Sequence, residues 1–195
     1  MNELLALLGF AFVSSVTPGP NNVMLWASGA TFGVRRTTRH VVGTALGIGA
    51  MALAVAAGLG TLITTVPMLG TAMKVAGSAY LLYLAWQIAR SGALQAATVS
   101  RPLGVVEAAS FQLVNPKAWV FALGAITTFR PAGLPIATGS LLVAAAMMLV
   151  IVPTAELWAA GGGALNGLLS GARTHRFVSL ALAAIVAATV VWVWI

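Results

Sequence analysis

Carboxamides, prolines and a lysine gather at two places in an otherwise apolar chain. The first is Thr17-Pro18-Gly19-Pro20-Asn21-Asn22 and the second is Asn115-Pro116-Lys117. A proline frees the backbone carbonyl four residues earlier, and a half-helix that begins near Pro20 directs unpaired N–H groups and a positive dipole end toward the break, which suits a carboxylate. The asparagine amides and the lysine charge add further partners. All the residues of these two stretches are therefore candidates for binding the polar ends of an α-amino acid.

The alternative is that each proline only kinks a helix. A proline alone in a membrane helix is most often a kink, because prolines are common in such helices. Two paired breaks that are flanked by asparagine and lysine favour a binding role instead. The distinction depends on whether the two breaks face one another.

Three further charged residues interrupt apolar stretches. Glu156 follows Pro153, and because an intramembrane carboxylate is a usual proton carrier, it is the first proton-coupling candidate. The equal alternative is a helix-end carboxylate that pairs with a loop arginine. Glu107 is the second candidate, although its place near the start of a helix favours an ordinary surface role. Lys74 is a secondary candidate for substrate contact, since its stem lies close enough to the membrane surface to snorkel.

The surrounding composition is that of a protein embedded in a lipid bilayer. Of the 195 residues, 60% are hydrophobic and 7% are charged, against about 25% charged residues in soluble domains. The formal charge of +7 comes from eight arginines and two lysines against three glutamates. The arginines lie between apolar runs, which indicates membrane topology rather than nucleic-acid binding. The chain has no cysteine, no aspartate and two histidines, so thiol chemistry is excluded and neither a metal centre nor a cofactor is expected.

Apolar stretches long enough to cross about 30 Å of hydrocarbon, which takes roughly 20 helical residues, nearly exhaust the chain. Six of them lie at 4–28, 41–66, 71–90, 103–129, 135–163 and 177–195. We therefore expect an all-α integral membrane protein with a single transmembrane transporter domain over residues 1–195. The first stretch is expected to be a retained span and not a signal peptide, because a positively charged segment before it is missing.

Cations mark one side of these spans. The first connection holds Arg35, Arg36, Arg39 and His40, and further cations flank the third connection and fill the fifth, namely Arg90, Arg101, Arg173, His175 and Arg176. The second connection has no cation and the fourth has only Arg130. By the positive-inside rule the odd connections are cytoplasmic and both termini lie outside.

Three spans per half require the halves, if related, to lie upside down relative to one another, as in the inverted repeats of secondary transporters. The repeats are expected at about residues 1–92 and 101–195. Pro18 and Pro116 each lie roughly 20 Å into the first span of their half at 1.5 Å per residue. Helices 1 and 4 are therefore predicted to break at corresponding depths, where polar backbone is tolerated only against protein or a water-filled cavity.

Small residues recur at a helical spacing that permits close packing. The pairs are Gly29/Gly33 and Gly43/Gly47, and such spacings let two helix backbones approach one another. The simplest expectation is packing within the chain. A homodimer interface is an alternative use of the same surface.

These motifs resemble the lysine exporter (LysE) superfamily, and within it the homoserine/threonine-resistance (RhtB) branch of amino-acid exporters. The likeness covers essentially the whole chain and includes TPGPN at Thr17–Asn21, FGVRRTTRHVVGTALG at Phe32–Gly47, KVAGSAYLLYLAWQI at Lys74–Ile88 and FQLVNPKAWVF at Phe111–Phe121. The doubled asparagine and the RRTTRHVVGTALG segment look most like the cysteine/O-acetylserine exporter type. The resemblance implies a multi-pass protein of the bacterial inner membrane that exports small amino acids with the proton gradient and has no bound cofactor. An aspartate seen in some members is missing here, so the resemblance does not supply the proton carrier.

The expected function is secondary export of a small amino acid or derivative, such as cysteine, O-acetylserine, homoserine or threonine, by alternating access around the site between helices 1 and 4. The expected partners are that amino acid and the lipid bilayer. One alternative is a channel for small solutes, which would need a ring of charged side chains or ordered carbonyls. A membrane-embedded enzyme is a weaker alternative, because three glutamates, two histidines assigned to loops and no cysteine offer little nucleophile or base. The chain is therefore not expected to be an enzyme.

Overall fold

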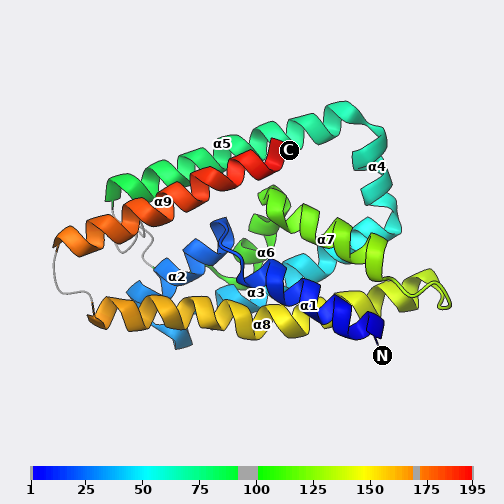
Figure 1. The fold of residues 1–195 in the computed structure, drawn as a ribbon, viewed down its shortest axis with the longest axis horizontal. Helices are drawn as coiled ribbons and strands as arrows, with labels where there is room; N and C mark the ends of the chain where they lie inside the picture. The colour runs from blue at the N-terminus through cyan, green and yellow to red at the C-terminus, as the bar shows by residue number, and fades with distance from the viewer. Residues whose placement is uncertain (1, 92–100, 169–171, 195) are drawn as a thin grey trace.

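Helices make up most of the residues that the structure describes, and they follow the apolar stretches of the sequence. The computed structural model describes residues 2–91, 101–168 and 172–194, and no strand occurs within them. The helices, shown in Figure 1, are α1 (Asn2–Val16), α2 (Pro20–Phe32), α3 (Val34–Ala54), a π-helical turn (Val55–Leu59), α4 (Gly60–Thr65), α5 (Pro67–Ser91), α6 (Val105–Val114), α7 (Pro116–Phe129), α8 (Ile136–Leu168) and α9 (Ala172–Trp194). The predicted all-α class is confirmed.

The number of helices that could cross a membrane is smaller than the predicted number of spans. Within the described residues, Val34–Leu62 and Ile136–Ala164 are long and apolar enough by themselves. A third span is obtained if Glu3–Val16 and Pro20–Phe32, which meet at an angle of 63°, are counted as one broken span. Val105–Val114 and Arg176–Val191 are apolar but shorter. By length and composition the structure therefore supports two or three spans.

Both predicted helix breaks are present, and their local cause is proline. Pro20 and Pro116 occupy the first turn of α2 and α7, where the missing N–H has no intrahelical partner to lose. The residue before a proline is driven out of the helical region by steric clash. Gly19 (φ −169°, ψ 173°) and Asn115 (φ −89°, ψ 104°) are accordingly extended. Each break thus begins a new half-helix at its proline.

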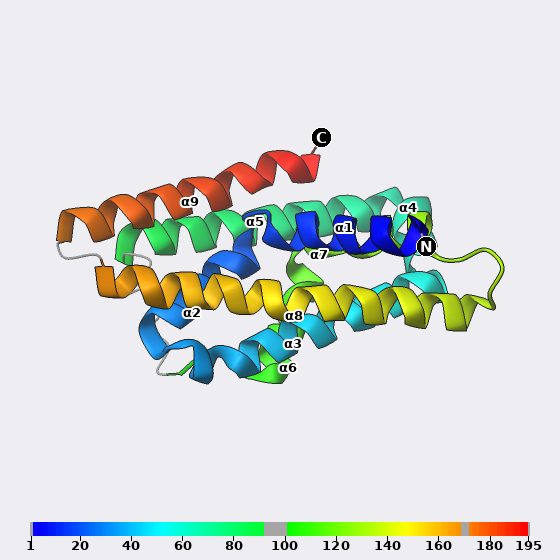
Figure 2. The same cartoon turned by 60° about the horizontal axis from the view of Figure 1, so that its bottom comes forward.

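Two layers of helices build the molecule. Figure 1 and Figure 2 show α5 and α9 running side by side apart from a larger group in which α3 and α8 are central. One apolar core joins α1, α3, α7 and α8 around residues such as Met51, Phe121 and Met147. A second core joins α2 to α5 and α9 around Trp26 and Leu81. The two half-helices α2 and α7 are thereby anchored in different cores.

Glycines permit the close crossings that hold this arrangement. A Cβ on Gly29 of α2 would lie 1.9 Å from the carbonyl oxygen of Ala159 in α8, and a Cβ on Gly162 would lie 1.9 Å from the carbonyl oxygen of Trp26. A Cβ on Gly43 of α3 would likewise lie 2.3 Å from the carbonyl oxygen of Val105 in α6. No side chain fits at these distances. The predicted use of Gly29 and Gly43 for packing within the chain is confirmed.

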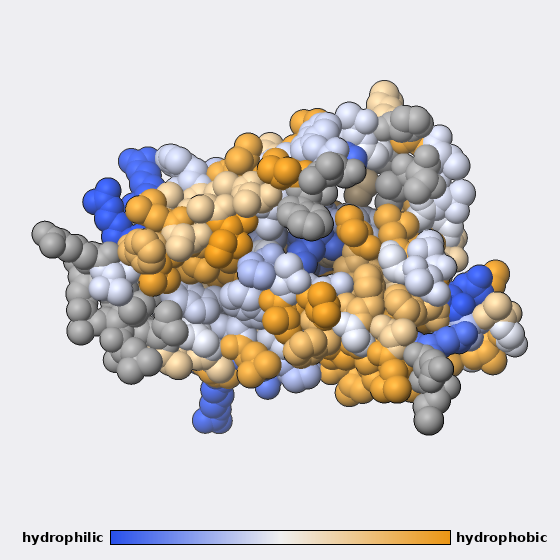
Figure 3. Space-filling view, in the orientation of Figure 1, coloured by the Kyte–Doolittle hydropathy of each residue, from blue (hydrophilic) through white to orange (hydrophobic). Residues whose placement is uncertain are grey.

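The outer surface is apolar, as contact with lipid requires. On α8 the side chains of Leu149 and Leu157 are 71% and 65% exposed, and a soluble protein rarely leaves such a surface uncovered. Figure 3 shows hydrophobic residues over much of one face, with strongly hydrophilic residues mainly at its edge and a small hydrophilic area in a recess near its middle. This pattern fits a multi-pass membrane protein.

Candidate functional site

The two helix breaks meet at one small cavity of about 40 Å³. Six of the predicted site residues line it, namely Gly19, Pro20, Asn21, Asn22, Asn115 and Lys117. The remaining three, Thr17, Pro18 and Pro116, lie next to it in the breaks without lining it. The other walls come from the end of α1 and from α3, α6, α7 and α8. The structure therefore brings both stretches to the same place, as paired breaks require.

Asn22 and Lys117 bind the backbone that the first break exposes. The Nδ2 group of Asn22 donates to the carbonyls of Ser15 (2.7 Å) and Thr17 (2.9 Å), and the Lys117 ammonium also donates to the Thr17 carbonyl. These carbonyls end α1, where a helix carries partial negative charge. Both side chains consequently stabilise the break in addition to lining the cavity.

Lys117 connects the two breaks across the cavity. It stands in the first turn of α7, where its positive charge is unfavourable for its own helix, and reaches the carboxyl end of α1, where that charge is favourable. A Cβ on Gly19 would lie 2.9 Å from Cδ of Lys117, so any other residue at this position would make the flexible lysine side chain shift. Gly19 therefore serves as a gap for Lys117.

A buried hydrogen-bond cluster centres on the amide oxygen of Asn21. Three donors approach Oδ1, namely Nε2 of Gln112 (3.0 Å), Oγ1 of Thr44 (3.2 Å) and Nε2 of His40 (3.3 Å). Gln112 continues the cluster, because its Oε1 accepts from Nδ2 of Asn115 at 3.1 Å. The cluster thus runs from α3 through the first break to the second break.

One backbone carbonyl fixes the direction of every hydrogen bond in this cluster. The Gln112 atom that lies 3.0 Å from the Ala108 carbonyl must be its NH₂ group, since a carbonyl only accepts. The Asn21 atom facing the same NH₂ group is then the oxygen, so Thr44 and His40 both donate to it. Oε1 of Gln112 then faces Asn115, so the NH₂ group of Asn115 donates to it and Oδ1 of Asn115 does not face Gln112. Oδ1 of Asn115 and Nδ1 of His40 are buried acceptors without a hydrogen-bond partner.

Comparison with known proteins decides the family. The profile of the LysE type translocators matches residues 12–193. The chain belongs to the LysE type translocator family. This family is one of transport proteins and not of enzymes, so the expectation of a non-enzymatic protein agrees with the family. The expected superfamily is likewise confirmed.

Individual relatives of this LysE-family chain carry a more specific name. The cysteine/O-acetylserine efflux protein of Klebsiella pneumoniae is 32% identical over 124 residues, which cover 64% of this chain and 63% of the relative. The protein of the same name from Escherichia coli strain K12 is 29% identical over 127 residues, which cover 65% of each chain. The matched part of the chain thus spans just under two thirds of the length of these curated relatives. No solved structure matches the chain.

Three residues of this candidate site were missed from the sequence, and one of them was misplaced. His40 was predicted in the first connection, but this is wrong: α2 and α3 are separated only by Gly33 (φ 79°), and His40 lies within α3 and is 1% exposed. Thr44 follows one helical turn later on the same face, and Gln112 is fully buried in α6. Polar residues inside apolar helices are themselves a signal of function, and this signal could have identified all three.

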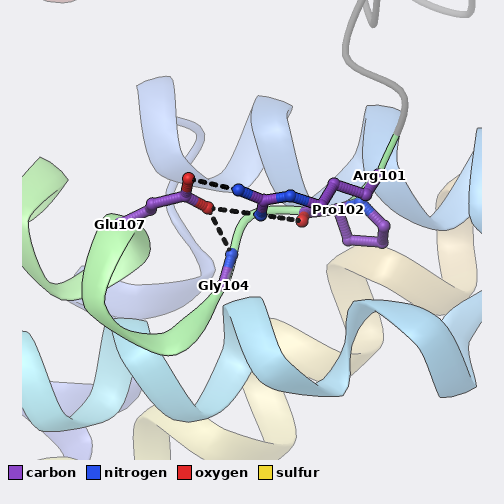
Figure 4. A network of polar contacts seen from close by, with 4 residues as sticks. All are labelled: Arg101, Pro102, Gly104 and Glu107. Atoms are coloured by element: carbon purple, nitrogen blue, oxygen red, sulfur yellow. Dashed lines mark hydrogen bonds and ion pairs between the residues drawn. The ribbon is translucent and has the colours of Figure 1, made fainter.

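The two predicted proton-coupling carboxylates lie outside the cavity. Glu107 forms an ion pair of 2.7 Å with Arg101 at the surface and also accepts from the backbone N–H of Gly104, as Figure 4 shows. It therefore also caps the start of α6. Glu156 is exposed on α8, and its side chain has no hydrogen-bond or ion-pair partner among the described residues. Neither residue lines the cavity.

Lys74 also lies away from the cavity lining. It is exposed on α5, with its ammonium 5.8 Å from the ring centre of Trp194 in α9. The indole N–H of Trp194 in turn donates to Oγ of Ser78 at 2.9 Å. These contacts join the outer two helices, which is a packing role.

Proposed function

We propose that the chain is a secondary exporter of small amino acids or their derivatives, working by alternating access and driven by the proton gradient. The observation that carries the proposal is the meeting of two proline-broken helices at one polar cavity. Paired half-helix ends around a cavity are the usual substrate site of secondary transporters. The name shared by the relatives supports a substrate such as cysteine or O-acetylserine, and homoserine or threonine has similar size and charge.

The cavity offers suitable partners for both ends of a zwitterion. Asn115 lines the cavity, and its Oδ1 is a buried acceptor without a partner. This atom suits an ammonium group, because an unpaired buried acceptor costs free energy until a donor arrives. The amino end of α2 and the Lys117 ammonium suit the carboxylate. Ile48, Phe121 and Ile151 supply apolar walls, which favour a small neutral side chain over a charged one.

The cavity is smaller than an amino acid in this conformation. A volume of about 40 Å³ accommodates roughly three water molecules on this measure, which is too little for an amino acid. Substrate entry must therefore separate some of the helices around the breaks. Such opening, first to one side and then to the other, is what alternating access means.

Helix contacts support the proposal of two inverted repeats within one domain. Exchanging the halves maps α1 on α6, α2 on α7, α3 on α8 and α5 on α9. The contact between α1 and α8 then becomes that between α6 and α3, and the contact between α2 and α8 becomes that between α7 and α3, all of which exist. The pairs α3·α8 and α5·α9 map on themselves and are also present. This correspondence favours two related halves. Together with the arginine pattern of the sequence, it leads us to propose six spans, some of them broken, in the bacterial inner membrane with both termini outside.

The proposed function can be tested by protection of a sensitive bacterium. Cells that express the chain are grown on a panel of single amino acids and analogues at inhibitory concentrations, and survival and extracellular amino acid are measured. We expect protection against cysteine, O-acetylserine or a similar small neutral compound, and loss of protection with Asn115→Ala at equal expression. A chain that protects against none of the panel, or that protects equally with Asn115→Ala, would refute this site or this function. Leakage of all small solutes at once would indicate a channel.

A further inference from the structure

We propose that His40 is the proton-binding group of the transport site and that it acts on the substrate through Asn21. This inference rests on the proposed export function and adds a residue that the sequence had assigned to a loop. His40 is a positioning residue, since it does not line the cavity itself. Its ring is 1% exposed and contacts the cavity only through the amide oxygen of Asn21.

The direction of the hydrogen bonds leaves one ring nitrogen ready for a proton. Nε2 of His40 donates to Oδ1 of Asn21, so the neutral ring carries its hydrogen on Nε2. Nδ1 then carries an unshared lone pair, and it is buried without a hydrogen-bond partner. A neutral histidine of this kind can take up one proton without giving up its existing hydrogen bond.

Other charged groups on the neighbouring helices are engaged elsewhere or exposed. On α3 itself, Arg36 and Arg39 are exposed, as is Arg35. The helix α2 has no titratable side chain, and α6 has only Glu107, which Arg101 holds at the surface. Within the described part of α8 only Glu156 is charged, and it is exposed. On α7, Lys117 lines the cavity but its ammonium binds the Thr17 carbonyl.

Protonation of His40 would make the proton and the substrate compete for Asn21. Oδ1 of Asn21 already receives three donors, although an amide oxygen has two lone pairs, so a neutral His40 holds it weakly. A substrate ammonium that binds Oδ1 of Asn115 has further N–H groups, and one of them can replace His40 at Asn21. A charged imidazolium forms a hydrogen bond roughly twice as strong and also repels an ammonium group. Mutually exclusive binding of proton and substrate is the condition for exchange of one for the other.

The proton transfer itself is a simple acid–base step. When the cavity opens to the acidic side, a hydronium ion loses one O–H bond, Nδ1 of His40 gains an N–H bond, and a water molecule remains. The ring gains one positive charge and the substrate ammonium leaves. When the cavity opens to the cytoplasmic side, Nδ1 returns the proton to water and Asn21 becomes available to the next substrate.

The test uses the full chain reconstituted in lipid vesicles and compares two substitutions. His40→Gln keeps an amide donor that can reach Asn21 but cannot be protonated, whereas His40→Asn is shorter and loses both properties. Radiolabelled cysteine exchange is measured with equal pH on both sides, and uphill transport is measured with an imposed pH gradient. For the wild type we expect KM to rise on the acid side, by at most about tenfold per pH unit for a single competing proton.

His40→Gln is expected to keep exchange with a KM within about threefold of wild type, since the hydrogen bond remains and only the titration is lost. Its KM should change less than about twofold across the acidic pH range in which the wild-type KM rises, and uphill transport should stop. His40→Asn should raise KM and also lose the pH dependence. The proposal is overturned if His40→Gln retains uphill transport and the wild-type pH profile.

Two further outcomes separate this inference from the proposed function. Loss of uphill transport in Glu156→Gln, with normal coupling in His40→Gln, would assign the proton to Glu156 and overturn the role of His40. Wild-type exchange that never responds to pH would also overturn it, while leaving amino-acid transport intact. Absence of any exchange of cysteine, O-acetylserine or threonine by the wild-type chain would instead refute the transport function on which the inference rests.

Discussion

At the scale of single residues, the site is defined by which polar atoms have partners and which do not. Asn22 satisfies the backbone of the first break, whereas Asn21 and Asn115 belong to the cluster around Gln112. Asn21 and Asn22, which are adjacent residues of the same type, therefore differ in role. Substitutions should separate the binding residues from those that hold the break.

The first prediction concerns Asn21 and Asn115. Replacing either with alanine should leave a substrate group or a buried partner unsatisfied, at a cost of about 1–3 kcal/mol, which corresponds to roughly a five- to hundredfold rise in KM. Because both amides bind Gln112, the double substitution should be non-additive. Efflux measured at several substrate concentrations gives the four KM values. Additive effects would show that the two breaks do not share one site.

The second prediction compares the two lysines. Lys117→Met keeps the stem but loses the ammonium, and we expect transport to fall by more than about tenfold, as loss of a charge-assisted hydrogen bond implies. Stability should change little, because Asn22 still donates to the Thr17 carbonyl. Lys74→Met should keep most of the activity, since Lys74 lies exposed against Trp194. Transport and detergent unfolding midpoints are measured for both, and equal losses of transport would contradict the assignment.

The sequence predicted the residues of the breaks better than those of the cluster. Proline and glycine act locally, so Gly19 and Pro116 could be recognised without a partner. His40 and Gln112 belong to the site because they contact Asn21, from which they lie 19 and 91 residues away in the sequence. The arginine pattern that predicts a loop also led to the prediction of His40 in that loop. Tertiary contact, not local chemistry, made these residues part of the site.

At the scale of helices, the sequence predicted where elements break but not which elements meet. Small-residue spacing indicated close packing for Gly29 and Gly43, and both do pack closely. The partners, α8 and α6, follow only from the three-dimensional arrangement. The number of spans is the largest difference between the prediction and the structure. A span that is broken into two shorter helices, such as α6 and α7, is not long enough in either piece to cross a membrane alone.

The third prediction concerns the crossing of α2 and α8. Gly29→Ala would place a methyl group 1.9 Å from the Ala159 carbonyl oxygen, so the helices must separate, and overpacking of this kind costs about 1–3 kcal/mol or more. The unfolding midpoint in detergent should fall. Gly9→Ala is the control, since nothing lies within 4 Å of its Cβ, and it should be neutral or stabilising. A Gly29→Ala protein as stable as Gly9→Ala would show that this crossing is not formed.

At the scale of the whole molecule, the account requires two halves that lie in opposite directions in the bilayer. The arginines at the start of α3 and before α6 should remain in the cytoplasm, and the start of α5 and the segment before α8 should face the other side. This arrangement places the two breaks at a common depth from opposite directions. Orientation is therefore a direct consequence of the inverted-repeat proposal.

The fourth prediction tests that orientation. A reporter that is active only outside the cytoplasm should work when fused near Met68 or Arg130 and fail near Arg36 or Arg101, because cations mark the cytoplasmic side. Enzyme activity of the fusions, corrected for their amount, gives the result. The reverse pattern would invert the topology, and activity at Arg36 equal to that at Met68 would exclude a span between them.

The central claim is that a small amino acid crosses the membrane through the cavity between the two breaks. The most direct measurement is concentration-dependent efflux of cysteine or O-acetylserine from lipid vesicles that contain the purified wild-type chain or Asn115→Ala. The account predicts saturable efflux by the wild type and, since the free acceptor at the cavity is removed, a KM about five- to hundredfold higher in the variant. Efflux that rises linearly without saturation, or an unchanged KM in Asn115→Ala, would contradict it.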